Sequence, residues 1–175
     1  MRVVLIAAQS LDGFITKHDE PGTAFTSPED KAYFRAVLAE FDCCVFGAET
    51  YRVSREFIRS QHPGRHLRVV VTRSPDQYAA DAARGALEFT NAAPAAIVAD
   101  LRGRGFPACA LLGGSEIHSL FFEAGLVNQV WLTVEPRLFG GGTPLLARPA
   151  DARLALQSIE KLGANTLLLK YLVTR

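Results

Sequence analysis

The sequence predicts an α/β fold: a central mixed, mostly parallel sheet flanked by helices in a three-layer arrangement, with antiparallel C-terminal strands. Three observations lead to this fold class. Short apolar runs, often β-branched, recur along the whole chain. Segments with helical periodicity lie between several of them, and this alternation is typical of a parallel sheet covered on both faces. In the last third of the chain, strand patterns follow one another with no long helix between them, which favours antiparallel pairing.

Six apolar runs are the expected main strands. Each is short and is bounded by turn-forming or polar residues, as expected of strands that are buried on both faces. They are VVLIAA (3–8), CCVFG (43–47), RVVVT (68–72), ALLGG (110–114), VWLTVEP (130–136) and TLLLKYLV (166–173). The segment ARLALQSIEKLG (152–163) shows a further strand pattern between the last two.

Four segments have the apolar spacing of an amphipathic helix. They are Pro28–Phe41, Thr50–Ile58, Ala93–Leu101 and Ser115–Ala124. The first has the clearest beginning, because Ser27 can cap it and Pro28 suits its first turn. Glu29 and Asp30 then complement the helix dipole. This explains Asp30 structurally, but a carboxyl group beside a pocket can also hold a substrate ring or relay a proton, so both interpretations stay open.

Composition and charge narrow the class of protein. The chain has 175 residues, of which 49% are apolar, and a net charge of +1. This length fits one domain, residues 1–175. The small net charge argues against nucleic acid or an anionic membrane as a partner, and no apolar run is long enough to span a membrane. We interpret MRVVLIAAQSLDG as the first strand of a cytoplasmic protein and not as a signal peptide.

The cysteines and histidines predict no metal site. Cys43, Cys44 and Cys109 lie within apolar runs, and an odd number of cysteines fits a reducing compartment. Cys43 and Cys44 are neighbours in a strand, so their side chains point to opposite faces and cannot bind one metal together. The four histidines form no ligand spacing with them.

The turn Gly113–Ser115 is the first candidate binding site. It joins an apolar strand to a helix start, where unpaired N–H groups and the helix dipole favour an anion. Glycines also let a ligand approach the backbone without meeting a Cβ. The alternative interpretation is that the glycines only allow the chain to turn and that the segment binds no ligand.

Three other segments are expected beside this turn. Ala7–Gln9, Gly47–Thr50 and Thr72–Arg73 each come at the end of an apolar run. In sheets of parallel strands ligands gather at the carboxyl ends of the strands. If the four strands are parallel, all four segments lie along one edge, which favours the binding interpretation of Gly113–Ser115.

Arginines are concentrated between Tyr51 and Pro75, where Glu56 is the single acid. They are Arg52, Arg55, Arg59, Arg65, Arg68 and Arg73. One interpretation is a solvated helix face, and the other is a phosphate clamp, because the arginine fork matches phosphate oxygens. Arg73 is the best candidate of the six for a phosphate contact, since it follows an expected strand at the proposed edge.

Several motifs together resemble the dihydrofolate reductase superfold, and most closely the reductase domain of riboflavin-biosynthesis proteins and its stand-alone relatives. The most specific stretch is LLGGSEIHSLFFEAGLVNQVWLTVEPRLFGGGTPLL, with a Gly-Gly turn, a helix, an apolar strand ending near proline, and a glycine-rich loop. SLDG (10–13), TSPED (26–30) and VFGAETY (45–51) are similar to other motifs of the family. The resemblance covers nearly the whole chain.

This resemblance implies an enzyme that binds NADPH and transfers its hydride. By position, the backbone of Ala7 and Ala8 meets the nicotinamide carboxamide, and Thr72 and Arg73 face the adenosine end. The resemblance also implies a cis peptide between Gly113 and Gly114. The further residues that it assigns to the cofactor are Ile15, Gly47, Ala48, Glu49, Thr50, Leu112, Gly113, Gly114, Ser115, Glu116 and Ile117.

For the substrate, the resemblance implies a small heterocycle, most directly a ribosylamino-pyrimidine. It assigns Ser10, Asp12, Gly13 and Phe34 to substrate binding. Three features depart from the pyrimidine reductases: Leu112 replaces an acid, YRVSREFIRSQHPGR (51–65) replaces a stretch containing Asp-Pro, and VNQ (127–129) replaces VDE.

Two alternatives to a pyrimidine reductase stay open. PEDKAYF matches a pattern of the dihydrofolate reductases that carries an acid, here Asp30, and WLTVE supplies the threonine of their facing strand, here Thr133. We therefore name Asp30 and Thr133 as the catalytic candidates, and a pterin reductase as the first alternative. The second is a nucleotide-binding protein without turnover.

The apolar C-terminal third predicts a homodimer. A strand with one face in water normally has polar residues at alternate positions. In the strand Thr166–Val173 the only polar residues are Thr166, Lys170 and Tyr171. A second copy related by a two-fold axis is the simplest cover, and relatives in the family commonly form dimers. The competing explanation is that helices of the same chain cover both faces.

Overall fold

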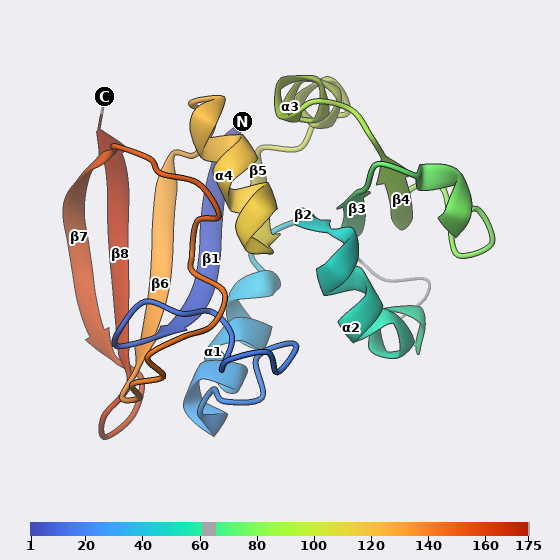
Figure 1. Ribbon diagram of the computed structural model, residues 1–175. Coiled ribbons are helices and arrows are strands. Elements are labelled where there is room, and N and C mark those ends of the chain that lie inside the picture. Colours follow the sequence, from blue (N-terminus) through green and yellow to red (C-terminus); the bar gives the residue numbers. More distant parts are fainter. Residues whose placement is uncertain (61–65, 175) are drawn as a thin grey trace.

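The computed structural model describes residues 1–60 and 66–174. Within them, eight strands form one sheet in the order β4-β3-β2-β5-β1-β6-β8-β7 (Figure 1). In chain order the strands are β1 (Arg2–Ser10), β2 (Cys43–Gly47), β3 (Leu67–Val71), β4 (Leu87–Thr90), β5 (Ala108–Gly113), β6 (Gln129–Glu135), β7 (Arg153–Lys161) and β8 (Leu167–Thr174).

The pairing of the strands confirms the expected mixed sheet. The pairs from β4 through β6 are all parallel, whereas β8 runs antiparallel to β6, and β7 antiparallel to β8. Each parallel crossover carries a helix or a long segment that returns the chain to the amino end of the next strand. β7 and β8 need only a tight connection, since antiparallel neighbours can be joined by a short turn.

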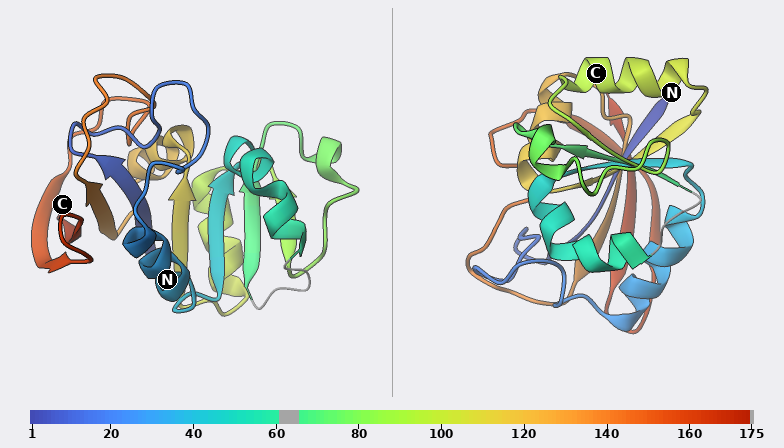
Figure 2. Two further views of the ribbon diagram at one scale, coloured as in Figure 1. Left: turned by 90° about the horizontal axis from the view of Figure 1, so that it is seen from below. Right: turned by 90° about the vertical axis from the view of Figure 1, so that its right-hand side faces the viewer.

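Four α-helices of the described chain cover the two faces of the sheet (Figure 2). They are α1 (Pro28–Leu38), α2 (Ala48–Ser60), α3 (Pro94–Gly103) and α4 (Ser115–Glu123), and a short 3₁₀ helix spans Pro75–Tyr78. α3 and α4 pack on one face, and α1 and α2 on the other. The fold is therefore the expected three-layer α/β arrangement.

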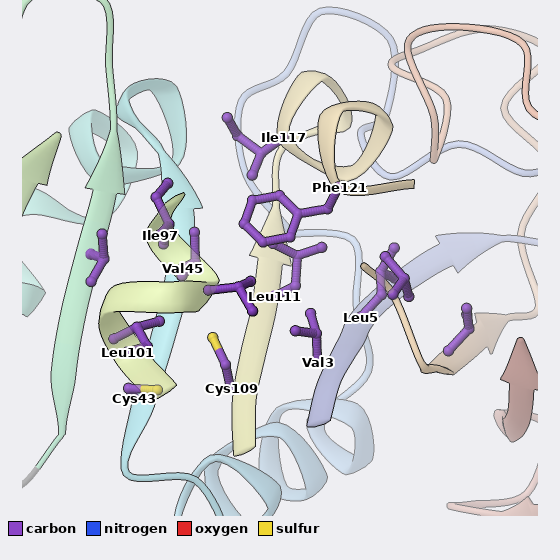
Figure 3. Close-up of a cluster of buried hydrophobic side chains, with 14 of the residues drawn as sticks. Val3, Leu5, Cys43, Val45, Ile97, Leu101, Cys109, Leu111, Ile117 and Phe121 are labelled. Atoms are coloured by element: carbon purple, nitrogen blue, oxygen red, sulfur yellow. The ribbon is translucent and has the colours of Figure 1, made fainter. Parts of the chain in front are cut away.

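The core lies in two layers, one on each face of the sheet. On the first, Leu5 and Leu111 from the central strands pack against Leu101 of α3 and Phe121 of α4 (Figure 3). Leu5, Leu101 and Leu111 are 0% exposed. Each buried leucine contributes about 1.5–3 kcal/mol relative to an exposed one, so this layer fixes α4 firmly on the sheet.

On the opposite face, the second layer joins α1 and α2 to the same strands. Val37 of α1 and Ile58 of α2 pack with Val4, Ile6 and their neighbours. Ser27 caps α1 as expected, since its hydroxyl oxygen accepts a hydrogen bond from the Asp30 backbone N–H at 3.1 Å. The first turn of α1 is therefore held in place at the sheet.

The expectations from the sequence differ from the structure in three places. The strand β4 was not expected, because only Leu87 of its four residues is fully buried and its apolar signal is short. α1 ends at Leu38 and not at Phe41, since Phe41 belongs to the turn that enters β2. Ala7–Gln9 does not follow the first strand but lies within β1, which extends to Ser10 through its pairing with β6.

Candidate cofactor and substrate site

The carboxyl edge of the parallel strands brings the candidate segments together. In the order of the strands, this edge carries Thr72 after β3, Gly47 on β2, Gly113 on β5 and Ala8 on β1. The four segments therefore share one edge, as the sequence predicts. Ala8 pairs with Thr133 of β6, so the backbone expected at the nicotinamide lies beside the catalytic candidates.

The turn between β5 and α4 contains two glycines that differ in backbone conformation and in the space around them. Gly113 has a φ of +102°, and a Cβ on it would stand 3.2 Å from two atoms of the His118 ring. Gly114, the N-cap of α4, has an ordinary φ of −72°. Among the described residues, a Cβ on Gly114 would meet only the Thr50 hydroxyl oxygen, at 3.9 Å. Neither the φ of Gly114 nor the space around its Cβ position requires glycine here. The peptide bond between the two glycines is cis, as the resemblance implies.

The junction of β2 and α2 lies against this glycine turn. A Cβ on Gly47 would stand 2.9 Å from Cγ1 of Ile117 and 3.8 Å from the backbone nitrogen of Gly114. α2 begins at Ala48, directly after the strand. Two helix N-termini therefore adjoin, and the unpaired N–H groups and dipole of each favour an anion.

Two buried polar atoms near the start of α4 have no hydrogen-bond partner among the described residues. They are the Ser115 hydroxyl and Nε2 of His118. His118 Nδ1 lies 2.9 Å from the carbonyl oxygen of Leu145, so Nδ1 carries the proton and Nε2 the lone pair. Burial lowers the pKa of His118 to about 4, so the ring is neutral at pH 7. The Ser115 hydroxyl, in contrast, remains free to donate to a bound group.

The acids in the first turns of the two helices pair with arginines. Glu49 forms an ion pair with Arg52, and Glu116 lies 2.6 Å from Arg148. Arg148 also binds Glu123 in the last turn of α4. These side chains are on the surface, so their pairs stabilise the helices only slightly.

The arginine cluster divides into a paired part and one exposed candidate. Arg55 and Arg59 bind the buried carboxylate of Asp81, at 2.7 and 3.7 Å, and Tyr51 donates to the same group. This favours the structural interpretation for α2. Arg73 is exposed after β3, beside Thr72, and stays the candidate for a phosphate contact. Arg68 lies within β3, and its buried Nη1 has no hydrogen-bond partner among the described residues. Arg65 lies outside the described residues.

Asp30 and Thr133 come together on the face covered by α1. Asp30 is 7% exposed and Thr133 is 1% exposed. Burial raises the pKa of Asp30 above the ordinary aspartate value, and the nearby hydroxyls of Thr133 and Thr26 oppose that rise. The two candidates therefore lie close together in a buried position, and their catalytic role stays a prediction. A buried aspartate with a raised pKa is suited to hold a proton close to a reacting atom.

A second buried acid, Glu135, stands at the end of β6 and was not predicted. One of its oxygens accepts from the backbone N–H and the hydroxyl of Ser27, both at 2.8 Å, and the other accepts from the Thr166 hydroxyl at 3.1 Å. The pattern VWLTVEP contains a signal that could have found it. Thr133 and Glu135 are two residues apart in one strand, so their side chains lie on the same face.

The SLDG segment forms part of a clamp between two loops. The Asp12 carboxylate accepts hydrogen bonds from the Ser10 hydroxyl at 2.5 Å and from the Phe139 and Gly140 backbone N–H groups. The Ile15 N–H donates to the Thr143 carbonyl oxygen. Gly13 has a φ of +92° in the tight turn between them. Asp12 thus ties the 11–17 loop to the 137–143 loop beside the ends of β1 and β6.

Two other candidates are less constrained. Phe34 lies on α1 with 36% of its surface exposed. Leu112, which stands where pyrimidine reductases carry an acid, is half-buried against the core layer of α1 and α2.

Neither metal-binding clusters of three or more His, Cys, Asp or Glu residues nor helices long and apolar enough to cross a membrane occur within residues 1–60 and 66–174.

Solved structures similar to this chain share its fold. One is a riboflavin biosynthesis protein, described as putative, from Shewanella sp. PV-4, with 21% identity, a TM-score of 0.77 and full coverage of both chains. Another is a pyrimidine reductase-like protein from Corynebacterium diphtheriae, with 17% identity and a TM-score of 0.77, covering 99% of this chain and 92% of that one. A third is the diaminohydroxyphosphoribosylaminopyrimidine deaminase/5-amino-6-(5-phosphoribosylamino)uracil reductase of Thermotoga maritima, with 15% identity and a TM-score of 0.79. This chain is covered over 99% of its length and that bifunctional chain over 56%.

No curated protein matches this chain in sequence. The family model of the RibD C-terminal domain, in contrast, matches residues 2–168, nearly the whole length. The chain belongs to the RibD C-terminal domain family, a family of reductase domains.

Proposed function

We propose that this protein is an NADPH-dependent reductase that transfers a hydride to a small heterocyclic substrate. The observation that carries the proposal is Gly114. It lies where two helix N-termini adjoin, and nothing in the described protein requires its lack of a side chain. A pyrophosphate that approaches this backbone gives the missing reason.

The residues present fit such a cofactor. Gly47–Thr50 and Gly113–Ile117 would hold the phosphates through backbone N–H groups, and the unpartnered Ser115 hydroxyl can donate a further hydrogen bond. Arg73, exposed after β3, would meet a 2′-phosphate. The backbone of Ala7 and Ala8, beside β6, would position the carboxamide of the nicotinamide.

The bound dinucleotide would supply a hydride, and the protein would supply orientation and a proton. Asp30 would hold that proton next to the nitrogen or oxygen of the C=N or C=O bond that accepts the hydride on carbon. The nearby Thr133 hydroxyl would orient the Asp30 carboxyl. Fixing these groups before the reaction lowers the entropic part of the barrier.

A ribosylamino-pyrimidine of the riboflavin-biosynthesis type is the substrate that we favour, because the chain belongs to the RibD C-terminal domain family. The closeness of Asp30 to Thr133 favours the alternative, a dihydrofolate or pterin reductase. Leu112, which places an apolar side chain where the pyrimidine reductases carry an acid, also bears on this choice. The alternative of another class is a nucleotide-binding protein without turnover.

The direct test is oxidation of NADPH, followed at its absorbance band, with a panel of ribosylamino-pyrimidines and pterins. We expect turnover with a ribosylamino-pyrimidine, and Asp30→Asn should reduce kcat by roughly a hundredfold or more because the proton donor is lost. Turnover only with pterins would select the alternative substrate class. Tight NADPH binding with no oxidation by any member of the panel would contradict a reductase.

The role of Gly114 predicts a selective loss of cofactor binding. Gly114→Ala adds one Cβ that the free protein accommodates, but that blocks the approach of a pyrophosphate. We expect the Kd for NADPH, measured by fluorescence titration, to rise tenfold or more, about 1.4 kcal/mol.

The matched control is Gly103→Ala at the end of α3, where a Cβ meets nothing within 4 Å among the described residues. It should leave the Kd unchanged. If folded Gly114→Ala protein binds NADPH as tightly as the wild type, the glycine turn has no place in the site.

The homodimer is also a proposal, and an exposed apolar surface on β7 and β8 supports it. Leu154, Leu156 and Ile159 are 44%, 48% and 60% exposed. They pair with Val173, Tyr171 and Leu169, so they share the face on which α3 and α4 pack. None of the described helices lies in front of β7 and β8 in Figure 1. A second copy of the chain would cover this surface.

Light scattering at micromolar concentration tests the dimer. We expect a mass near twice the 19.0 kDa of one chain. Ile159→Lys should shift the mass to that of a monomer, because a charge in an apolar interface is costly. The control Leu138→Lys, at a residue that is 72% exposed on another loop, should remain dimeric. A wild-type mass near 19.0 kDa would rule the dimer out.

Two wider expectations also belong here. We propose that residues 1–175 form one domain, since a single sheet runs through the described residues. We also propose a cytoplasmic location, which fits three free and buried cysteines, Cys43, Cys44 and Cys109.

A further inference from the structure

Glu135 is a buried acid for which the proposed function has no use. It is 2% exposed at the end of β6. Three donors face its two oxygens: the Ser27 N–H, the Ser27 hydroxyl and the Thr166 hydroxyl. No lysine, arginine or histidine among the described residues lies within ion-pair distance of it. Its neighbours are arranged for a carboxylate that only accepts hydrogen bonds.

Ser27 connects this carboxylate to Asp30. The Ser27 hydroxyl oxygen accepts from the Asp30 backbone N–H at 3.1 Å, so its own proton is directed to Glu135, 2.8 Å away. One hydroxyl therefore caps α1 and binds Glu135 at the same time. The start of α1, which carries Asp30, is fixed to the end of β6, which carries Thr133 and Glu135.

Asp30 has different surroundings. The groups that change its pKa are the hydroxyls of Thr133 and Thr26, the carboxylate of Glu135 and the ammonium group of Lys31. The Tyr33 phenol is also near, since the charge of Asp30 raises the pKa of Tyr33. Burial is the main cause that raises the pKa of Asp30; the negative charge of Glu135 raises it further, and Lys31 lowers it. Because Lys31 is exposed and Glu135 is buried, water screens the lysine more strongly.

We propose that Glu135 is a positioning residue that carries the negative charge of a carboxyl pair, so that Asp30 keeps the proton. The three donors around Glu135 leave no acceptor there for a carboxyl proton, and two neighbouring carboxyls do not both ionise readily. The inference rests on the proposed function for the use of that proton, but the coupling of the two acids does not depend on it.

The chemistry balances with the proposed reduction. The hydride adds to the carbon of the C=N or C=O bond, and the proton of Asp30 goes to the nitrogen or oxygen. Asp30 is left as a carboxylate beside Glu135, an unfavourable pair of charges that favours rapid uptake of a new proton. An open groove of about 320 Å³, lined among others by Ser27, Glu135 and Thr166, opens this end of β6 to solvent.

The test is a pH titration of Asp30 by carbon NMR of protein labelled at aspartate carboxyls, with its signal assigned by its absence in Asp30→Asn. In Glu135→Gln, whose side chain keeps shape and an acceptor oxygen but loses the charge, we expect the Asp30 midpoint to shift to lower pH. The control Glu29→Gln removes an exposed charge from the same helix turn and should leave the midpoint in place. An unchanged or higher midpoint in Glu135→Gln would overturn the proposal.

A second variant covers the case in which Glu135→Gln does not fold. Thr166→Val removes one donor from Glu135 and keeps both carboxyls, so the charge is held less well and the Asp30 midpoint should again move to lower pH. An unchanged midpoint in that variant would likewise contradict the proposal.

The pH dependence of turnover tests the proposal independently of the NMR titration. Activity that needs protonated Asp30 falls as pH rises through its pKa, so in Glu135→Gln the alkaline limb of the kcat profile should move to lower pH. NMR shifts without any NADPH oxidation would reject the reductase and keep the carboxyl pair. Turnover with an unmoved Asp30 midpoint would keep the reductase and reject the role of Glu135.

Discussion

The contact between Gly47 and Ile117 is the constraint on which the candidate site depends. Because Gly47 has no side chain, Ile117 reaches into the end of β2 and brings the first turn of α4 against the first turn of α2. Ile117 is in turn held by the core layer that contains Leu111 and Phe121 (Figure 3). The buried core thus fixes the position of two helix N-termini, and the backbone groups that would meet a phosphate are rigid before any ligand arrives.

The site has two parts with different physical requirements. At the glycine turns the protein offers backbone groups and removes side chains, which suits a charged ligand that must come close. At the end of β1 and β6 it buries two carboxyls, Asp30 and Glu135, and satisfies them with hydroxyls and one backbone N–H. Burying acids costs stability, since the charged form loses water. This cost is typical of residues kept for chemistry and not for folding.

Local signals in the sequence predict most of the fold. Apolar runs and helical spacing locate the main strands and all four helices, and the two glycines and Ser27 locate the turn and the cap. β4 was missed because a short edge strand needs only one buried residue. The partners of Asp12 and of Arg55 could not be predicted, because they come from residues 139–140 and from Asp81, far along the chain. The alternation in VWLTVEP could have placed Glu135 on the same face as Thr133, but its partners Ser27 and Thr166 come to it only in the folded chain.

A crystal structure of the protein with bound NADP⁺ tests the central claim most directly. The account predicts that the pyrophosphate lies within hydrogen-bond distance of the Gly114 turn and the Ser115 hydroxyl, with the 2′-phosphate at Arg73 and the nicotinamide beside Ala8 and Asp30. A dinucleotide bound elsewhere, with the space above Gly114 filled by water or by a side chain, would contradict it.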